Sequence, residues 1–249
     1  MIDVTITATH RHKLLDKTLS SFALNSNLFE LTTKAIVNID PVGVDHNHIN
    51  TVDVVSKHLH NSDYINRFNA PPEPSFPKAF KWCWSTTTSK YVFNLEDDWE
   101  LLQHVDFQEM IDVMESEPDL ASLRLPFKPQ DKESMKNWKY FFPAHGKYYE
   151  CPDELKREVG FCGHPSLLRG DFVRACEKLL YDTSNPEKQF HQRGNPPIML
   201  EVDKWRFGVW KTDGKIAVKD IGREWMVKNG FQKKGTKAFF QEWERVEHE

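Results

Sequence analysis

The sequence contains few cysteines, and none lies in a pair of the kind that binds zinc or performs redox chemistry. The 249-residue chain has four, at Cys83, Cys151, Cys162 and Cys176, and no two of them are separated by only two residues. This spacing predicts free thiols in a reducing compartment rather than a disulfide framework. A zinc site built from Cys151, Cys162, His164 and Cys176 would match no standard ligand spacing.

Long apolar runs are also absent. No segment approaches the roughly 20 consecutive apolar residues that a membrane-spanning helix requires. The apolar stretch at residues 1–8 is too short for a signal peptide, and basic residues follow it instead of preceding it. We therefore expect a cytoplasmic protein without a membrane anchor.

The chain has no excess of positive charge. Its 33 Lys and Arg and 37 Asp and Glu give a net charge of −4, so no overall electrostatic attraction to nucleic acid is expected. The charge is uneven, however, because residues 204–237 carry ten basic residues against three acidic ones. This basic C-terminal third either contacts phosphates, those of a nucleotide or of a polymer, or is a solvated surface.

Predicted strands and helices alternate along the first part of the chain. Strands are expected at Ile2–Ala8, Lys34–Asp40, Tyr64–Phe68 and Tyr91–Leu95, with helices between them at Lys13–Leu24, Asn50–Leu59 and Phe80–Thr87. This alternation predicts βαβ units, and hence an α/β fold with a mainly parallel sheet flanked by helices. No linker or repeat divides residues 1–249, so we expect a single domain with ligands at the carboxyl ends of its strands.

The later part of the chain has a less regular pattern. Its predicted elements are a helix at Phe107–Met114, a strand at Leu120–Leu125, helices at Asp171–Leu180 and Ile198–Trp210, a strand at Lys215–Val218 and a helical tail from Thr236.

Three consecutive carboxylates directly follow the apolar strand Tyr91–Leu95. They are Glu96, Asp97 and Asp98. Alternate side chains of a strand point the same way, so Glu96 and Asp98 can converge on one point. Such a cluster is costly unless a cation neutralises it, and carboxylate oxygens suit Mg²⁺ or Mn²⁺. The alternative is that these acids begin a helix.

These segments resemble a known family. Val4–Phe22 is similar to the opening strand, loop and helix of family 2 glycosyltransferases, and Lys34–Asp40 and Ser75–Trp84 resemble their second strand and the helix before the metal strand. Tyr91–Asp98 resembles their DxD strand, with Glu96 in place of the first Asp. The resemblance implies a Rossmann-like GT-A domain in which residues 1–125 bind a nucleotide-sugar and residues 126–249 bind the acceptor.

The resemblance also implies roles for individual residues. The donor would be bound by Thr7, Thr9, Arg11, Asp40, Lys78, Glu96, Asp97 and Arg223, with Asp40 near the base or ribose and Arg223 near a phosphate. Mn²⁺ or Mg²⁺ would be held by Asp98, with Glu96 beside it and Asp220 as a further ligand. A UDP-sugar is the favoured donor.

The acceptor side of the resemblance points to a carboxylate base roughly 100 residues after the metal motif. Glu201 and Asp203 fit that place, and on a helix they point to opposite sides. We favour Glu201 because Trp205 shares its face, while a surface acidic pair is the alternative. A base there would deprotonate the acceptor hydroxyl and give inversion. Trp99, His164 and Trp205 are the candidate acceptor contacts.

Several functions stay open at this stage. The acceptor would be a glycan or small molecule, although the basic C-terminal third also fits a phage-type enzyme that transfers a sugar to hydroxymethylated DNA bases, in which case the location would be the host cytoplasm. A nucleotidyltransferase is disfavoured because residues 9–13 contain no glycine for a phosphate loop. A non-catalytic nucleotide-binding protein is the remaining alternative.

Overall fold

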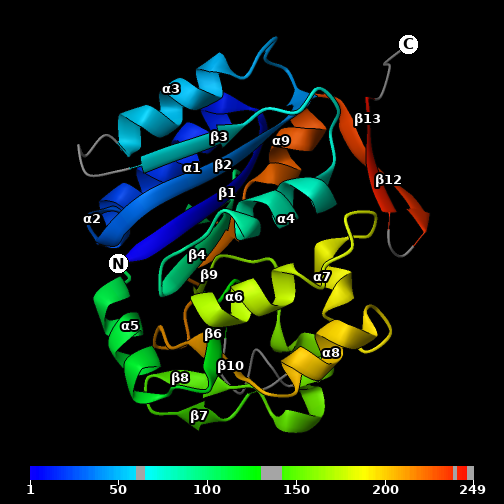
Figure 1. The fold of residues 1–249 in the computed structure, drawn as a ribbon. Helices are drawn as coiled ribbons and strands as arrows, with labels where there is room; N and C mark the ends of the chain where they lie inside the picture. Colours follow the sequence, from blue (N-terminus) through cyan, green and yellow to red (C-terminus); the bar gives the residue numbers. More distant parts are fainter. Residues whose placement is uncertain (60–64, 130–141, 238–239, 246–249) are drawn as a thin grey trace.

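A nine-stranded sheet runs through the computed structural model and carries helices on both faces (Figure 1). The structure describes residues 1–59, 65–129, 142–237 and 240–245. The strand order is β3-β2-β1-β4-β9-β6-β10-β8-β7. This is a mixed, mostly parallel sheet in a single domain, which confirms the predicted α/β class.

The first four strands are all parallel, as predicted. They are β1 (Ile2–His10), β2 (Thr32–Gly43), β3 (Ile65–Asn69) and β4 (Tyr91–Glu96). The helices between them are α1 (His12–Asn25), α2 (Leu28–Leu31), α3 (Ile49–His58) and α4 (Phe76–Ser85). Helix α4 begins four residues earlier than expected because Pro77 is accommodated in its first turn, where the missing N–H costs nothing.

The second half of the sheet contains an antiparallel strand at its centre. Strand β9 (Ser166–Arg169) pairs antiparallel with β4 on one side and with β6 (Leu120–Arg124) on the other. The sheet continues through β10 (Arg206–Trp210), β8 (Tyr148–Glu150) and β7 (Ala144–His145). The helices of this half are α5 (Phe107–Ser116), α6 (Gly170–Glu177), α7 (Pro186–Gln189) and α8 (Pro196–Val202), with short helical turns at Asp153–Leu155 and Lys156–Gly160.

The predicted helix Ile198–Trp210 is wrong in its second half. Helix α8 ends at Val202, and Arg206–Trp210 forms β10 instead, parallel to β6. Phe207 and Val209 alternate with the less bulky Gly208, which fits a strand buried in a sheet. A side chain at Gly208 would collide with Tyr148 of β8, so this register depends on glycine.

The C-terminal segment also differs from the prediction. Strand β11 (Val218–Asp220) lies further along than the expected Lys215–Val218 and pairs with β5 (Trp99–Leu101) outside the main sheet. After α9 (Gly222–Lys228), the chain forms a hairpin of β12 (Phe231–Lys237) and β13 (Phe240–Arg245), so the predicted helical tail from Thr236 is wrong.

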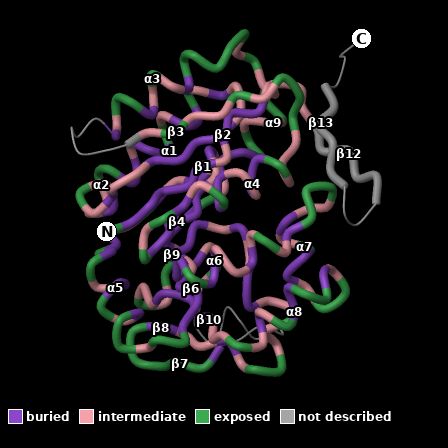
Figure 2. The backbone as a smooth tube through the Cα atoms, in the orientation of Figure 1, coloured by how far each residue is buried: buried purple, intermediate pink, exposed green. Residues whose placement is uncertain are grey.

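Each face of the sheet packs its own core. Along β4, Tyr91, Phe93 and Leu95 pack with α1 and α5 residues, while Val92 packs on the other face with α4 and α6 residues. Figure 2 shows the inner strands β1, β2 and β4 as mostly buried. Within the described part of the chain, no helix has both the length and the apolar character needed to cross a membrane.

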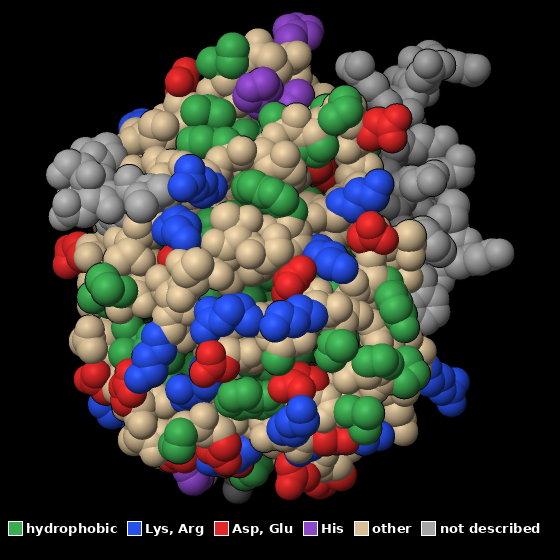
Figure 3. Space-filling view, viewed as in Figure 1, with side chains coloured by type: hydrophobic (Ala, Val, Ile, Leu, Met, Phe, Trp, Pro, Cys, Tyr) green, Lys and Arg blue, Asp and Glu red, His purple; other side chains and the backbone are tan. Residues whose placement is uncertain are grey.

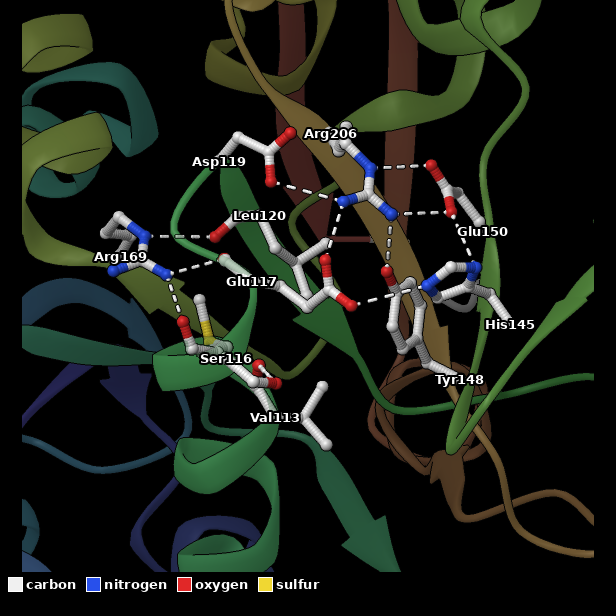
Figure 4. A network of polar contacts seen from close by, with 11 residues as sticks. Val113, Ser116, Glu117, Asp119, Leu120, His145, Tyr148, Glu150, Arg169 and Arg206 are labelled. Atoms are coloured by element: carbon white, nitrogen blue, oxygen red, sulfur yellow. Dashed lines mark hydrogen bonds and ion pairs between the residues drawn. The ribbon is translucent and has the colours of Figure 1, made fainter.

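An arginine-centred cluster closes the far end of the sheet (Figure 4). The Arg206 guanidinium on β10 pairs with Glu150 at 2.7 Å, Glu117 at 2.8 Å and Asp119 at 3.2 Å. His145 on β7 lies 3.3 Å from Glu117 and 3.4 Å from Glu150. These contacts join β7, β8 and β10 to the segment between α5 and β6.

Candidate functional site

The carboxyl ends of β1, β2 and β4 meet at one edge of the sheet. Thr9 of β1 is opposite Asp40 of β2, and Thr7 of β1 is opposite Glu96 of β4. The next two residues, Asp97 and Asp98, form the turn that follows β4 at this edge. The three strand ends predicted to bind ligand therefore do converge, as parallel strands require.

Asp97 is the fixed centre of this edge. Its carboxylate accepts hydrogen bonds from the main-chain N–H and the hydroxyl of Thr9, both at 2.9 Å, and from the Arg11 side chain. The Asp97 N–H donates to the Thr7 carbonyl, and its own carbonyl accepts from Thr18 at 2.9 Å. With only 3% of its side chain exposed, Asp97 is a buried, fully bonded carboxylate that orients Arg11.

Asp98 lies beside this pair in a more open position. Its side chain is 17% exposed, and its Oδ2 lies 3.4 Å from the same Arg11 guanidinium. Its carbonyl accepts from the Ile221 N–H at 2.8 Å, and α9 begins directly against its carboxylate. A Cβ on Gly222 would approach Asp98 Cγ to 2.8 Å, so glycine is needed here for α9 to pack on the carboxylate.

Arg11 connects the two aspartates to the C-terminal segment. Its guanidinium stands over the Trp225 ring of α9, 5.2 Å from the ring centroid. Burial favours the neutral guanidine, but Asp97 and Asp98 outweigh it and raise the Arg11 pKa. The charge of Arg11 is therefore secured where two carboxylates and an aromatic ring converge.

Asp40 has a separate structural task. Its carboxylate accepts hydrogen bonds from the Asn38 amide at 2.8 Å and from the Ser75 N–H at 3.0 Å, just before α4 begins. Burial raises the pKa of Asp40, and the nearby Asp97 adds to that rise. Asp40 thus anchors the loop after β3 at the edge of the site.

The other predicted donor and metal residues occupy varied positions. Lys78 is exposed on α4, and Glu96 is partly buried at the end of β4. Asp220 accepts hydrogen bonds from the N–H groups of Gly222 and Arg223, and it pairs with the Arg223 side chain at 3.2 Å. Asp220 therefore caps the start of α9. A metal bound to the same carboxylate would have to replace these hydrogen bonds.

An aromatic group begins at Trp99, the residue after Asp98. The ring of Trp99 lies 5.1 Å from that of His164, and His164 lies 4.1 Å from Phe127. The segment that carries His164 is tied to the sheet because Gly163 donates to Glu187 at 2.6 Å and accepts from Asn94 of β4 at 3.1 Å. The structure thus brings together two predicted acceptor contacts, Trp99 and His164.

The predicted base lies elsewhere in the molecule. Glu201 accepts from the Trp205 indole at 3.0 Å, so the expected proximity of these two residues is confirmed, and Trp205 packs on Phe172 of α6. Asp203 follows α8 and pairs with Arg157. In Figure 1, α8 lies in the lower half and α9 in the upper half, so these contacts do not join either carboxylate to the Asp98 edge.

The metal prediction has a limited structural counterpart. Among the residues that the structure describes, no three His, Cys, Asp or Glu side chains form a metal-binding group. Mg²⁺ usually takes one or two protein carboxylates and completes its shell with water and substrate phosphates. Asp98, partly exposed beside the fully bonded Asp97, fits that smaller demand.

No protein-family model matches the chain, and no curated protein is similar to it in sequence. Solved structures do resemble it. Residues 1–349 of TarS from S. aureus, in complex with UDP-GlcNAc, superpose with a TM-score of 0.56 at 10% identity, over 87% of this chain and 57% of that TarS chain. HddC from Yersinia pseudotuberculosis gives 0.52 at 14% identity, over 89% of this chain and 94% of HddC.

The chain therefore has the same overall fold as TarS and HddC. It spans between 36% and 61% of the length of the TarS chains it resembles. At this level of identity the similarity concerns the fold alone. The activity of the chain therefore has to be inferred from its site residues.

Some residues of the site were not predicted. Thr18, Asn94, Gly222 and Trp225 position the site through contacts with residues distant in the sequence, and none lies in a recognisable motif. Their roles depend on which elements become neighbours in space. The Asn94 position carried a signal, because a polar residue interrupts an otherwise apolar strand.

Proposed function

We propose that the protein transfers a sugar from a nucleotide-sugar donor, favouring a UDP-sugar, to an acceptor hydroxyl, with Mn²⁺ or Mg²⁺ as cofactor. The observation that carries the proposal is the pair of aspartates at the end of β4. Asp97 is buried and bonded to Thr9 and Arg11, while Asp98 remains partly exposed next to it. Asp98 is thus a partly exposed carboxylate at the strand edge where α/β proteins bind nucleotides, a position from which it could contact a cation.

Each residue at this edge has a distinct task in the proposal. Asp98 would hold the cation together with diphosphate oxygens of the donor, and Arg11 would add positive charge beside it. A bound Mn²⁺ or Mg²⁺ would supply Lewis acidity that stabilises the departing diphosphate. Thr7, Thr9 and Asp40 would border the nucleoside, since they end β1 and β2 at the same edge.

The acceptor would meet Trp99 and His164. Trp99 directly follows Asp98 in the chain, its ring contacts that of His164, and aromatic faces suit the apolar faces of sugars. A glycan or small acceptor is favoured over DNA because several basic residues of the C-terminal third pair with acids: Lys204 with Glu201, Lys219 with Glu224 and Arg223 with Asp220. On the face in Figure 3, Lys and Arg alternate with Asp and Glu rather than forming one basic field.

Glu201 and Asp203 stay predictions for the catalytic base. Burial raises the pKa of Glu201, but hydrogen bonds from Lys204 and Trp205 outweigh it, so the net shift is downward. Arg157 lowers the pKa of Asp203. A lower pKa makes a carboxylate a weaker proton acceptor. Separate Glu201→Gln and Asp203→Asn variants with unchanged transfer rates would exclude both.

Thermal unfolding with nucleoside diphosphates tests the donor site. UDP at about 100 times its Kd should add about 2.7 kcal/mol, which raises the Tm by about 5–10 °C, and the shift should require Mn²⁺. In Asp98→Asn the shift should disappear, while the exposed Asp182→Asn serves as a matched control that keeps it. Parallel measurements with GDP, dTDP and CDP identify the base.

Turnover distinguishes an enzyme from a binding protein. Release of UDP from a UDP-sugar in the presence of Mn²⁺ should fall by about a hundred-fold or more in Asp98→Asn, since a metal contributes several kcal/mol to charge stabilisation. Binding without release would instead support a non-catalytic nucleotide-binding protein. No Tm shift with any nucleotide would make the acidic pair structural and overturn the proposal.

A further inference from the structure

Cys162 differs from the other cysteines in its exposure and its neighbours. Cys83, Cys151 and Cys176 are buried, whereas Cys162 is partly exposed. The sulfur of Cys162 lies 3.2 Å from Nδ1 of His164 and 3.3 Å from Nη1 of Arg124. Two groups that can carry positive charge therefore contact the same sulfur.

The electrostatics of this cluster favour the thiolate. Burial on its own would raise the pKa of Cys162, and Glu187 adds slightly to that, but His164 and Arg124 outweigh both and lower the pKa to about 6. The pKa of His164 is raised: its burial favours the neutral ring, but the neighbouring Cys162 outweighs that effect. The pair thus resembles an ion pair at neutral pH.

The buried cysteines provide an internal contrast. Burial raises the pKa of both Cys83 and Cys151 to about 12. Burial also raises the pKa of Cys176. Thiols of this kind are inert because the thiolate is the nucleophile.

We propose that Cys162, with His164 and Arg124, forms a reactive thiolate site that exchanges with small disulfides. In this step the Cys162 sulfur attacks one sulfur of the disulfide, the S–S bond breaks, and the second sulfur leaves as a thiolate. One disulfide replaces another, so no further oxidant is needed. The product is a mixed disulfide on Cys162.

This site adjoins the proposed acceptor side. His164 contacts both Cys162 and Trp99, so an adduct on Cys162 alters the surroundings of a predicted acceptor residue. A slower sugar transfer after modification is the expected consequence, and this link alone rests on the proposed function. The reactivity of the Cys162 thiol is measured by mass spectrometry, so the test does not depend on whether the protein transfers sugar.

The pH dependence of alkylation tests the proposal. Folded protein is treated briefly with iodoacetamide between about pH 5 and pH 9, and peptide mass spectrometry follows each cysteine. Labelling of Cys162 should rise with a midpoint of about 6. At pH 6 it should be roughly ten-fold faster than an ordinary thiol, since its larger thiolate fraction outweighs its lower intrinsic nucleophilicity. Oxidised glutathione should leave one adduct, also on Cys162.

Variants separate the cluster from simple exposure. His164→Gln and Arg124→Gln should each shift the midpoint of Cys162 labelling upward, whereas His58→Gln on the distant α3 should leave it unchanged. Cys162→Ser should abolish the fast labelling. A midpoint above about 8, or labelling of Cys162 no faster than that of the buried cysteines, overturns the proposal.

Discussion

Two arginine-centred clusters at different parts of the sheet use charge in different ways. Arg11 faces Asp97 and Asp98 at the carboxyl edge of β1 and β4, where the Arg11 side chain is only 4% exposed. Arg206, at the far end of the sheet, is 24% exposed and pairs with three carboxylates, Glu117, Asp119 and Glu150. Both look alike as lists of ion pairs, but their surroundings differ.

The difference shows what distinguishes a candidate site from a structural clamp. In the Arg206 cluster, Glu150 links β8 to β10, and Glu117 links the segment after α5 to β10. Holding these segments together is a sufficient structural reason for the cluster. In the Arg11 cluster, the buried Asp97 supplies that packing role, while Asp98 adds a second carboxylate beside Arg11 that is partly exposed. A partly exposed charge at the carboxyl edge of a parallel sheet is the feature that points to a ligand.

The largest expected effect is on stability, in Asp97→Asn. Removing the Asp97 charge leaves the buried Arg11 with only Asp98, at 3.4 Å, and should lower the free energy of unfolding by about 3–5 kcal/mol. Urea denaturation at neutral pH measures it, with Asp119→Asn in the exposed part of the other cluster as the control. A loss below about 1 kcal/mol would show that water screens the Arg11 pair, and that the Arg11 and Arg206 clusters do not differ as proposed.

Much of the fold could be predicted from the sequence because local patterns and tertiary contacts agree in its first half. The alternation in β1 and the helical spacing in α1 lead to the same arrangement that the sheet imposes. The local pattern and the tertiary contacts disagree at Arg206–Trp210. Apolar residues there continue the helical spacing of α8, but the segment pairs with β6 and forms a strand. Tertiary pairing overrides local pattern there.

The site could be predicted only in part for the same reason. The run from Glu96 to Asp98 indicated a charged strand end. It did not indicate that Arg11 and Thr9 would donate hydrogen bonds to Asp97, or that Asp98 would be partly exposed. Contacts across long stretches of chain, such as Ile221 with Asp98, have no local signal. The prediction for Glu201 likewise found its local partner, Trp205, but could not locate the pair relative to Asp98.

Gly222→Ala tests whether the position of Asp98 matters, with a smaller expected effect. The added methyl group would collide with the Asp98 carboxylate and move it away from Arg11. If Asp98 holds the cation, UDP-sugar turnover should fall by about ten- to a hundred-fold, equivalent to about 1.4–2.8 kcal/mol. Val227→Ala, an exposed change on the same helix, should leave the rate unchanged. Normal turnover in folded Gly222→Ala would argue against Asp98 as the metal ligand.

Arg206→Gln should cost less than Asp97→Asn, even though it removes more ion pairs. Water screens these partly exposed groups, so a loss of about 1–2 kcal/mol in the free energy of unfolding is expected. A loss as large as that of Asp97→Asn would mean that exposure does not separate the two clusters.

The pH dependence sharpens this third prediction. Arg206 lowers the pKa of Glu117 in the folded state, chiefly through its hydrogen bond. A carboxylate with a lowered folded pKa stabilises the protein above its unfolded pKa of about 4.3, and this stabilisation is lost as the pH falls through the folded value. The gap in stability between wild type and Arg206→Gln should therefore shrink below about pH 4.3. Urea unfolding at neutral and acidic pH measures it, and a gap that widens in acid contradicts the assignment.

The smallest effect is expected for His145→Gln, and it tests how the Arg206 cluster is organised. His145 is 48% exposed and lies more than 3 Å from both Glu117 and Glu150, so its loss should change the free energy of unfolding by less than about 0.5 kcal/mol. A double variant with Arg206→Gln should then show nearly additive losses. If His145→Gln alone costs as much as Arg206→Gln, the cluster acts as one cooperative network. Exposure would then be a poor guide to the energetic role of charged groups in this fold, and the partial exposure of Asp98 would lose its value as a marker of the site.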